Sequence, residues 1–357
     1  MGAQNKLSGS ATGEVAGIGF TGCSAVNAAQ SHTQPGGQRR QVVLKGRRVR
    51  TIDVHAHCMV PDAMALLNFK GSQRPGLVMM VQSRIGEMDE QGIDMEALSI
   101  NPFWYKAERD VAAQVVKIQN EKLAELCGTY PDRFVAFASV ALQYPDLAIQ
   151  QLENAIKKLG LRGVAVGASV AGDEFSDLRF HPFWAKCEQF GTLIFIHPAS
   201  TPDLARRFKG GGWLENVIGN PLDTTIALSH LIFDGTLDRF PGLKICAAHG
   251  GGYLASYAPR SDYYGRVRPD RFARIPLKKK PTEYLRDLYF DSLIFTSEAL
   301  RHLVAEVGAS QVVMGTDHPI PWQPEAVDHI LNTPSLSDDE RIAILGETAA
   351  KLLGIKS

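Results

Sequence analysis

From residue 50 onward, short apolar runs alternate with amphipathic stretches, and this alternation strongly limits the possible folds. Continuously apolar runs separated by helical patterns indicate a parallel sheet that is covered on both faces. Eight such units in roughly 300 residues predict a (β/α)8 barrel. The alternative is an open doubly wound sheet, but no Gly-x-Gly-x-x-Gly follows the first run. The predicted strands are residues 50–54, 95–100, 133–140, 162–166, 193–197, 243–248, 288–292 and 311–316.

The amphipathic stretches between these runs are expected to form helices. Thr296 or Ser297 stands directly before one of them and is a suitable N-cap residue. The clearest predicted helices are residues 108–127, 146–159, 183–190, 224–239, 298–307 and 338–353.

Composition separates the barrel from the first 48 residues. Residues 1–48 are rich in Gly, Ser, Ala, Gln and Asn, which predicts a mostly disordered segment. Residues 15–29 resemble an export signal weakly, because they lack a basic start and a fully apolar centre. We therefore divide the chain into residues 1–48, disordered or a vestigial signal-like segment, and a barrel domain over residues 49–357.

The balanced charge argues against certain binding partners, and the scattered cysteines argue against a disulfide-rich protein. Lys plus Arg equals Asp plus Glu at 38 each, which argues against a nucleic-acid partner or an acidic membrane surface. The five cysteines are scattered and form no Cys-x-x-Cys pair, so we expect no disulfide framework. No apolar stretch is long enough to cross a membrane. A cytoplasmic protein is predicted, with export of a processed form as the alternative.

Metal-binding side chains stand at the ends of several predicted strands. His55 and His57 are two residues apart, so both imidazoles can point to one side of a strand. His197 ends another predicted strand, and His249 and Asp317 each directly follow one. In a barrel these ends meet at one rim, where active sites are found.

Three imidazoles and one carboxylate suit one Zn(II) ion, or Mn(II), with one position left open for water. The run at residues 162–166 offers no Lys, Glu or Cys that could bridge two metals, so one ion is predicted. One histidine of the four is then free to act as a general base or proton shuttle. Gly250 to Gly252 would let the backbone approach the site, or would form a tight turn.

These motifs carry a family resemblance. The segments from Asp53 to His57, His197-Pro198, His249-Gly-Gly-Gly and Gly315-Thr-Asp317 resemble the amidohydrolase superfamily, and in it the α-amino-β-carboxymuconate-ε-semialdehyde decarboxylases. The resemblance implies a (β/α)8 barrel with one Zn(II) that removes a carboxylate as CO2 without an organic cofactor. It implies that His55, His57, His197 and Asp317 are the metal ligands, and that His249, with Asp317, is catalytic.

The same resemblance implies how a small-molecule carboxylate substrate is held. It assigns two substrate-binding arginines to Arg84 and Arg260, and a pocket tryptophan to Trp213. The second arginine comes from the neighbouring subunit in the family, so a homodimer with shared sites is implied. Arginine suits this role because its guanidinium can contact a carboxylate through two hydrogen bonds.

The pocket departs from the family at three positions. Ala199, Asn216 and Ile320 stand where the family has aromatic residues, which indicates that the lining has changed while the metal chemistry is retained. We therefore predict a metal-dependent non-oxidative decarboxylase, a carboxy-lyase, for a small unsaturated or aromatic carboxylic acid. A lactonase, amidohydrolase or hydratase on the same scaffold is the alternative, and a non-catalytic metal-binding protein is a third. Salicylate-type relatives typically carry Glu-x-His in place of His55-x-His57, which disfavours that subgroup.

Overall fold

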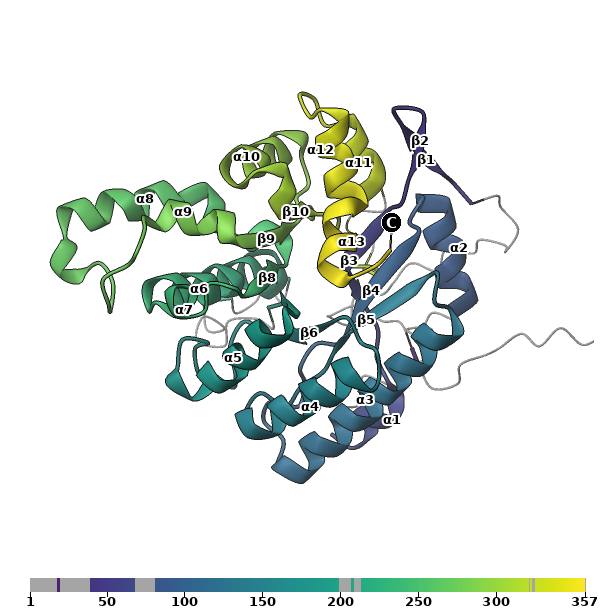
Figure 1. Cartoon of the computed structure of the whole chain (residues 1–357), viewed down its shortest axis with the longest axis horizontal. Coiled ribbons are helices and arrows are strands. Elements are labelled where there is room, and N and C mark those ends of the chain that lie inside the picture. Colours follow the sequence, from purple (N-terminus) through teal and green to yellow (C-terminus); the bar gives the residue numbers. More distant parts are fainter. Residues whose placement is uncertain are drawn as a thin grey trace, which may run out of the picture.

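The structure is a computed structural model that describes residues 18–19, 39–67, 81–198, 207–208, 213–320, 322 and 325–356. Eight parallel strands form one sheet in the order β10-β9-β8-β7-β6-β5-β4-β3, surrounded by helices (Figure 1). Each strand lies in or overlaps one of the apolar runs, so the predicted (β/α)8 barrel is confirmed. The strands are β3 (Ile52–His57), β4 (Met95–Ser99), β5 (Phe134–Ala138), β6 (Gly163–Val166), β7 (Leu193–Ile196), β8 (Lys244–Ala247), β9 (Leu288–Asp291) and β10 (Val312–Val313).

The first and last strands of the barrel meet at a seam that is held by few backbone hydrogen bonds. A single bridge pairs Ala56 of β3 with His318, which follows β10. The His57 amide donates to the His318 carbonyl at 2.7 Å, and the Asp317 amide donates to the His55 carbonyl at 2.7 Å. Three of the four predicted metal ligands therefore lie at this seam.

The helices follow the predicted stretches closely, and Thr296 caps one of them by accepting a hydrogen bond from the Ala299 amide. The stretch 224–239 is divided at Gly235, whose φ is +78°. The stretch 338–353 contains a π-helical turn, Ala343–Glu347, where Gly346 lies so near the Arg50 carbonyl that a Cβ would clash. Within the described residues, no helix is both long enough and apolar enough to span a membrane. The helices are α1 (Pro61–Ala65), α2 (Val81–Gln91), α3 (Arg109–Thr129), α4 (Pro145–Lys157), α5 (His181–Phe190), α6 (Asn220–Phe233), α7 (Thr236–Arg239), α8 (Leu254–Val267), α9 (Pro281–Tyr284), α10 (Ser297–Val307), α11 (Ala326–Asn332), α12 (Asp338–Ile342) and α13 (Thr348–Leu353).

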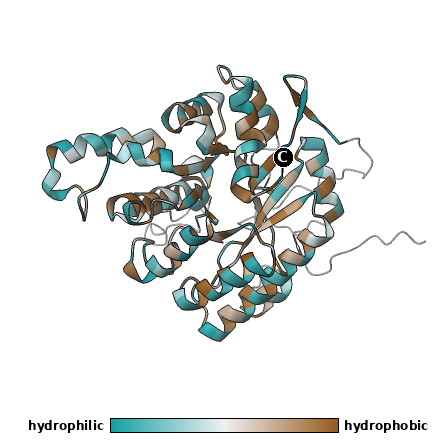
Figure 2. Ribbon diagram, in the orientation of Figure 1, coloured by the Kyte–Doolittle hydropathy of each residue, from teal (hydrophilic) through white to brown (hydrophobic). Residues whose placement is uncertain are grey.

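Apolar side chains fill the barrel and the layer between the strands and the helices. Figure 2 shows hydrophobic residues on the strands and on parts of the surrounding helices. Phe137 and Phe195 stack inside the barrel with their ring centroids 5.5 Å apart. Leu352 and Leu353 of α13 pack into the same apolar cluster as Ile52, at the start of β3. The apolar filling thus starts at the amino ends of the strands, and polar side chains collect at the carboxyl ends.

Part of the segment predicted to be mostly disordered is folded. Residues 42–49 form an antiparallel hairpin of β1 (Val42–Leu44) and β2 (Arg47–Val49). Arg39 and Arg48 both pair with Asp94, which ties this hairpin to the barrel. Residues 1–17 and 20–38 lie outside the described residues, so the prediction for them stays a prediction.

Candidate metal centre and active site

The structure brings the four predicted ligands together at the carboxyl ends of three strands. His55 and His57 lie on β3, His197 directly follows β7, and Asp317 follows β10. One ligand atom from each lies within 4.8 Å of the others, and all four residues are buried. Residues that are up to 262 positions apart in the chain, 317 minus 55, therefore form one compact cluster.

The spacing of these atoms suits a divalent cation. The Nε2 atoms of His55 and His57 are 3.1 Å apart. Asp317 Oδ1 lies 3.2 Å from His55 Nε2 and 2.8 Å from His57 Nε2. Tetrahedral ligands at typical zinc distances lie about 3.3 Å from one another. Small adjustments would place all of them around one ion, so the donor set fits the predicted metal.

Two further polar side chains orient the imidazoles of β3. His55 Nδ1 lies 2.6 Å from Asp291 Oδ2, and His57 Nδ1 lies 3.0 Å from Ser99 Oγ. The Ser99 hydroxyl can donate to the Ala56 carbonyl at 3.2 Å, which leaves it as the acceptor of a proton on His57 Nδ1. Both rings then direct Nε2 at the metal position, and such partners typically fix the ring orientation and tautomer of a ligand.

Asp291 and Ser99 were missed by the sequence reasoning, although a signal existed. Asp291 is the last residue of β9 and Ser99 is the last residue of β4, so both lie in the layer of strand ends that holds the ligands. Gly315 makes this layer possible, because a Cβ there would come within 3.0 Å of the His55 Cβ and 2.8 Å of the Asp291 Cβ.

In the metal-free cluster the charges are strongly coupled. Burial opposes a charge on His55, but Asp317 and Asp291 raise the pKa of its imidazole to about 10. Burial also opposes ionisation of Asp317, but His55 and His57 hold its pKa well below the usual range. A proton on His55 therefore occupies the cluster between two carboxylates, and a divalent cation would displace it.

His249 stands beside the cluster on a strained turn. Its φ is +56°, and Gly250, Gly251 and Gly252 that follow also have positive φ. Its amide donates to Asp291 Oδ2 at 3.0 Å, and its ring centroid is 5.1 Å from that of His55 and 5.3 Å from that of His197. Burial and the cationic His55 lower the pKa of His249 to about 4. His249 is therefore neutral near pH 7, and its Nδ1 has no hydrogen-bond partner among the described residues.

Arg84 contacts the backbone of the segments that carry the ligands. Its side chain is fully buried on α2, and its guanidinium donates to Glu96 at 2.6 Å and to the carbonyls of His57 and His318 at 3.0 and 3.3 Å. Because the side chain is fully buried, a substrate carboxylate could reach it only if the surrounding residues moved. Substrate binding by Arg84 stays a prediction, and these contacts favour a different role.

The other predicted substrate residues are exposed. Arg260 lies on the surface of α8, and Trp213 is 68% exposed just before a π-helical turn, Glu215–Gly219. Asn216 lies in that turn, Ile320 is buried, and Ala199 lies outside the described residues. The roles of Arg260 and Trp213 in substrate binding stay predictions.

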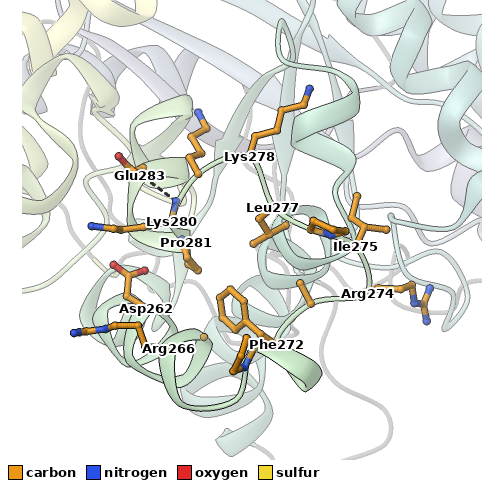
Figure 3. Close-up of a pocket in the computed structure, with 15 residues that line it drawn as sticks. Asp262, Arg266, Phe272, Arg274, Ile275, Leu277, Lys278, Lys280, Pro281 and Glu283 are labelled. Carbon is orange, nitrogen blue, oxygen red and sulfur yellow. Dashed lines mark hydrogen bonds between the residues drawn. The ribbon is translucent and has the colours of Figure 1, made fainter.

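A separate pocket lies beside α8, which extends from one side of the barrel (Figures 1 and 3). Lys278, Lys280 and Arg266 contribute positive charge to it, while Asp262 and Glu283 contribute negative charge. None of the predicted ligands or His249 lines this pocket. The metal cluster at the barrel rim is therefore the candidate active site.

The fold and this cluster define a class, namely (β/α)8 barrels with a metal centre at the carboxyl ends of the strands. The model of the amidohydrolase family matches residues 52–355, so the chain belongs to that family. The 2-amino-3-carboxymuconate-6-semialdehyde decarboxylase of Dictyostelium discoideum is 32% identical over 276 residues, which cover 76% of each chain. The gamma-resorcylate decarboxylase of Rhizobium radiobacter is 30% identical over 289 residues, which cover 76% of this chain and 86% of that protein.

A solved structure supports the same placement. The dihydroxybenzoic acid decarboxylase of Polaromonas sp. JS666, determined with bound manganese and the inhibitor 2-nitroresorcinol, is 26% identical with a TM-score of 0.76. The alignment covers 86% of this chain and 97% of that one. The predicted family is confirmed by these matches.

Proposed function

We propose that this chain is a metal-dependent non-oxidative decarboxylase of a small unsaturated or aromatic carboxylic acid. The observation that carries the proposal is the placement of a neutral histidine, His249, beside a three-histidine, one-aspartate cluster. The relatives support it, because those at 30% and 32% identity are both named decarboxylases. The names of these relatives favour decarboxylation over hydrolysis, for which the same metal and base would also be suitable.

His55, His57, His197 and Asp317 would hold one divalent ion, which we propose to be Zn(II), with Mn(II) as the alternative. When bound, this ion would act as a Lewis acid that stabilises negative charge developing on the substrate. Neighbouring residues keep the ligand side chains oriented toward the ion. Asp291 and Ser99 hold the two imidazoles of β3 so that the unprotonated Nε2 atoms face the ion.

His249 would move the proton that decarboxylation requires. The bond between the carboxylate and its carbon breaks, CO2 leaves, and the electron pair that remains on the carbon must accept a proton. A neutral imidazole can take a proton from water or substrate and return it to that carbon. The low pKa of His249 suits this relay, because the protonated ring gives its proton up readily.

The substrate side of the proposal rests on exposed residues. Arg260 would contact the substrate carboxylate of a neighbouring subunit in a homodimer, and Trp213 would line the pocket. The changed residues Asn216 and Ile320 would set a substrate preference of this chain's own. We also propose a cytoplasmic location, without an organic cofactor.

The first experiment measures metal content by elemental analysis and CO2 release from a panel of muconate-like and aromatic acids. About one ion per chain with CO2 release from at least one acid is expected. Asp317→Ala should remove both the metal and the activity, whereas His302→Asn, on the exposed surface of α10, should change neither. Metal without CO2 release would contradict the proposal, and lactones and amides would then be the next panel.

A further inference from the structure

The seam between β3 and the segment after β10 carries most of the metal site. Backbone pairing there is limited to a single bridge and a few separate hydrogen bonds. His55 and His57 approach from one side of the seam and Asp317 from the other. A small shift across the seam would change the distances from Asp317 to both histidines.

Arg84 contacts both sides of this seam. Its Nη1 donates to the carbonyl of His57 on β3, and its Nη2 donates to the carbonyl of His318, next to Asp317. One rigid, planar guanidinium therefore holds both sides of the seam at the residues that carry or adjoin the ligands.

Glu96 of β4 and Glu87 of α2 fix this guanidinium and the segment after β10. Glu96 accepts from Arg84 Nε at 2.6 Å and lies 2.6 Å from His318 Nδ1, while Glu87 lies 2.9 Å from His318 Nε2. Burial opposes the charge on Glu96, but Arg84 and His318 lower its pKa to about 2 and keep it ionised. Arg84 and Glu87 are three residues apart on α2, so one face of that helix supplies both contacts.

We propose that Arg84 is a positioning residue of the metal centre, which clamps the barrel seam so that His55, His57 and Asp317 keep the geometry that retains the ion. Full burial of the side chain and its two carbonyl acceptors distinguish this role from a direct contact with the substrate. The inference rests on the ligand assignment of the proposed function. The clamp also explains why Arg84 stands one turn before Met88 on the buried face of α2.

The test measures how fast a chelator removes Zn(II) from the purified, metal-loaded protein, together with the absorption spectrum of the Co(II)-substituted protein. Arg84→Met should lose the metal about 10- to 100-fold faster, by analogy with the loss of metal affinity when residues that orient metal ligands are removed. Its Co(II) bands should change, because the ligand geometry relaxes. Arg84→Lys, whose ammonium cannot reach Glu96 and both carbonyls together, should be intermediate.

Arg133 provides a matched control. It is also mostly buried, and its guanidinium donates to two carbonyls, those of Asp94 and Ile93, and pairs with Asp89. These acceptors precede β4, at the opposite end of the barrel from the metal cluster. Arg133→Met should therefore lower the melting temperature without changing the rate of metal loss or the Co(II) spectrum.

Three outcomes decide the inference. If Arg84→Met does not fold, the double variant Arg84→Met/Glu96→Gln removes the carboxylate that the single variant leaves without its arginine, and the same fast metal loss is expected. Metal loss at the wild-type rate, with a large rise in KM, would overturn the clamp and assign Arg84 to the substrate. A wild-type protein that binds no metal would instead overturn the ligand assignment itself.

Discussion

The two sides of the barrel rim hold their histidines in different ways. At the seam, His55 and His57 each have a polar partner on Nδ1, Asp291 and Ser99, and their Nε2 atoms face the metal position. Beyond β8, the ring of His249 has no partner on Nδ1 among the described residues, and Asp291 instead holds its backbone amide. Hydrogen bonds therefore fix the imidazole rings on the seam side. On the β8 side, the backbone of His249 is held while its ring Nδ1 stays free to exchange a proton.

This difference suits two tasks. A ligand must present one nitrogen in one tautomer, which a hydrogen bond to the other nitrogen enforces. A proton carrier must change its protonation state during each turnover, and a strong charged partner would resist that change. Asp291 serves both sides, because one oxygen faces the His55 ring and the same carboxylate accepts from the amides of His249 and Gly250.

Replacing His249 should have the largest effect that leaves the metal in place. We expect His249→Asn to lower kcat about 100- to 10,000-fold, since the proton relay is lost, while the metal content stays unchanged. Steady-state kinetics and elemental analysis on the same sample measure this. Loss of metal in this variant would show that His249 is a ligand and would abolish the distinction between the two sides.

Asp291 should have the next largest effect, and it should affect both sides together. Asp291→Asn keeps the shape but removes the charge beside His55, so we expect metal affinity and kcat each to fall about 10-fold or more. Competition with a chelator gives the affinity. Asp94→Asn is the control, because Asp94 is also buried but pairs with Arg39 and Arg48 and precedes β4, at the opposite end of the barrel from the metal cluster. If the two variants lose metal equally, the special role of Asp291 is wrong.

The sequence predicted the strands and the clustering of the candidate ligands, but not the side chains that support these ligands. Continuous apolar runs ending in His or Asp were enough to place His55, His197 and Asp317 at strand ends, because the parallel barrel brings such ends together. Asp291 also lies near the end of a predicted strand, but its role depends on Gly315 letting β9 and β3 approach, which is a three-dimensional packing effect.

Backbone conformation and burial were also beyond the reach of sequence patterns. His249 and Asp317 have positive φ, at +56° and +65°, and although His and Asp adopt such φ more often than most residues, residue type alone does not predict it. Substrate contact by Arg84 stays a prediction, and its buried contacts with Glu96 and with the carbonyls of His57 and His318 depend on how α2 packs against β4 and β3. Patterns of residue type predict which helices and strands form. The contacts of a buried arginine depend on how several of these elements pack together.

Removing Ser99 should have a smaller effect, confined to the seam side. Ser99→Ala deletes one neutral hydrogen bond to His57 Nδ1, so we expect about a 2- to 10-fold loss of metal affinity. Ser292→Ala is the control, because Ser292 is also buried at a strand end but its hydroxyl has no partner among the described residues. An equal loss in both variants would mean that buried serines near the rim matter only for packing.

The smallest expected effect is that of mild acid on His249. Its pKa is lowered to about 4, so the neutral form is lost only as the pH falls through that value. At pH 5 about nine tenths of His249 is still neutral, and a bound cation in place of the His55 proton would preserve the lowering. We therefore expect kcat/KM to change less than about twofold between pH 8 and pH 5, measured only where elemental analysis shows full metal content. An acid limb near pH 6.5 with metal retained would show that His249 titrates as an ordinary, solvated histidine, and the contrast between the two sides of the rim would fail.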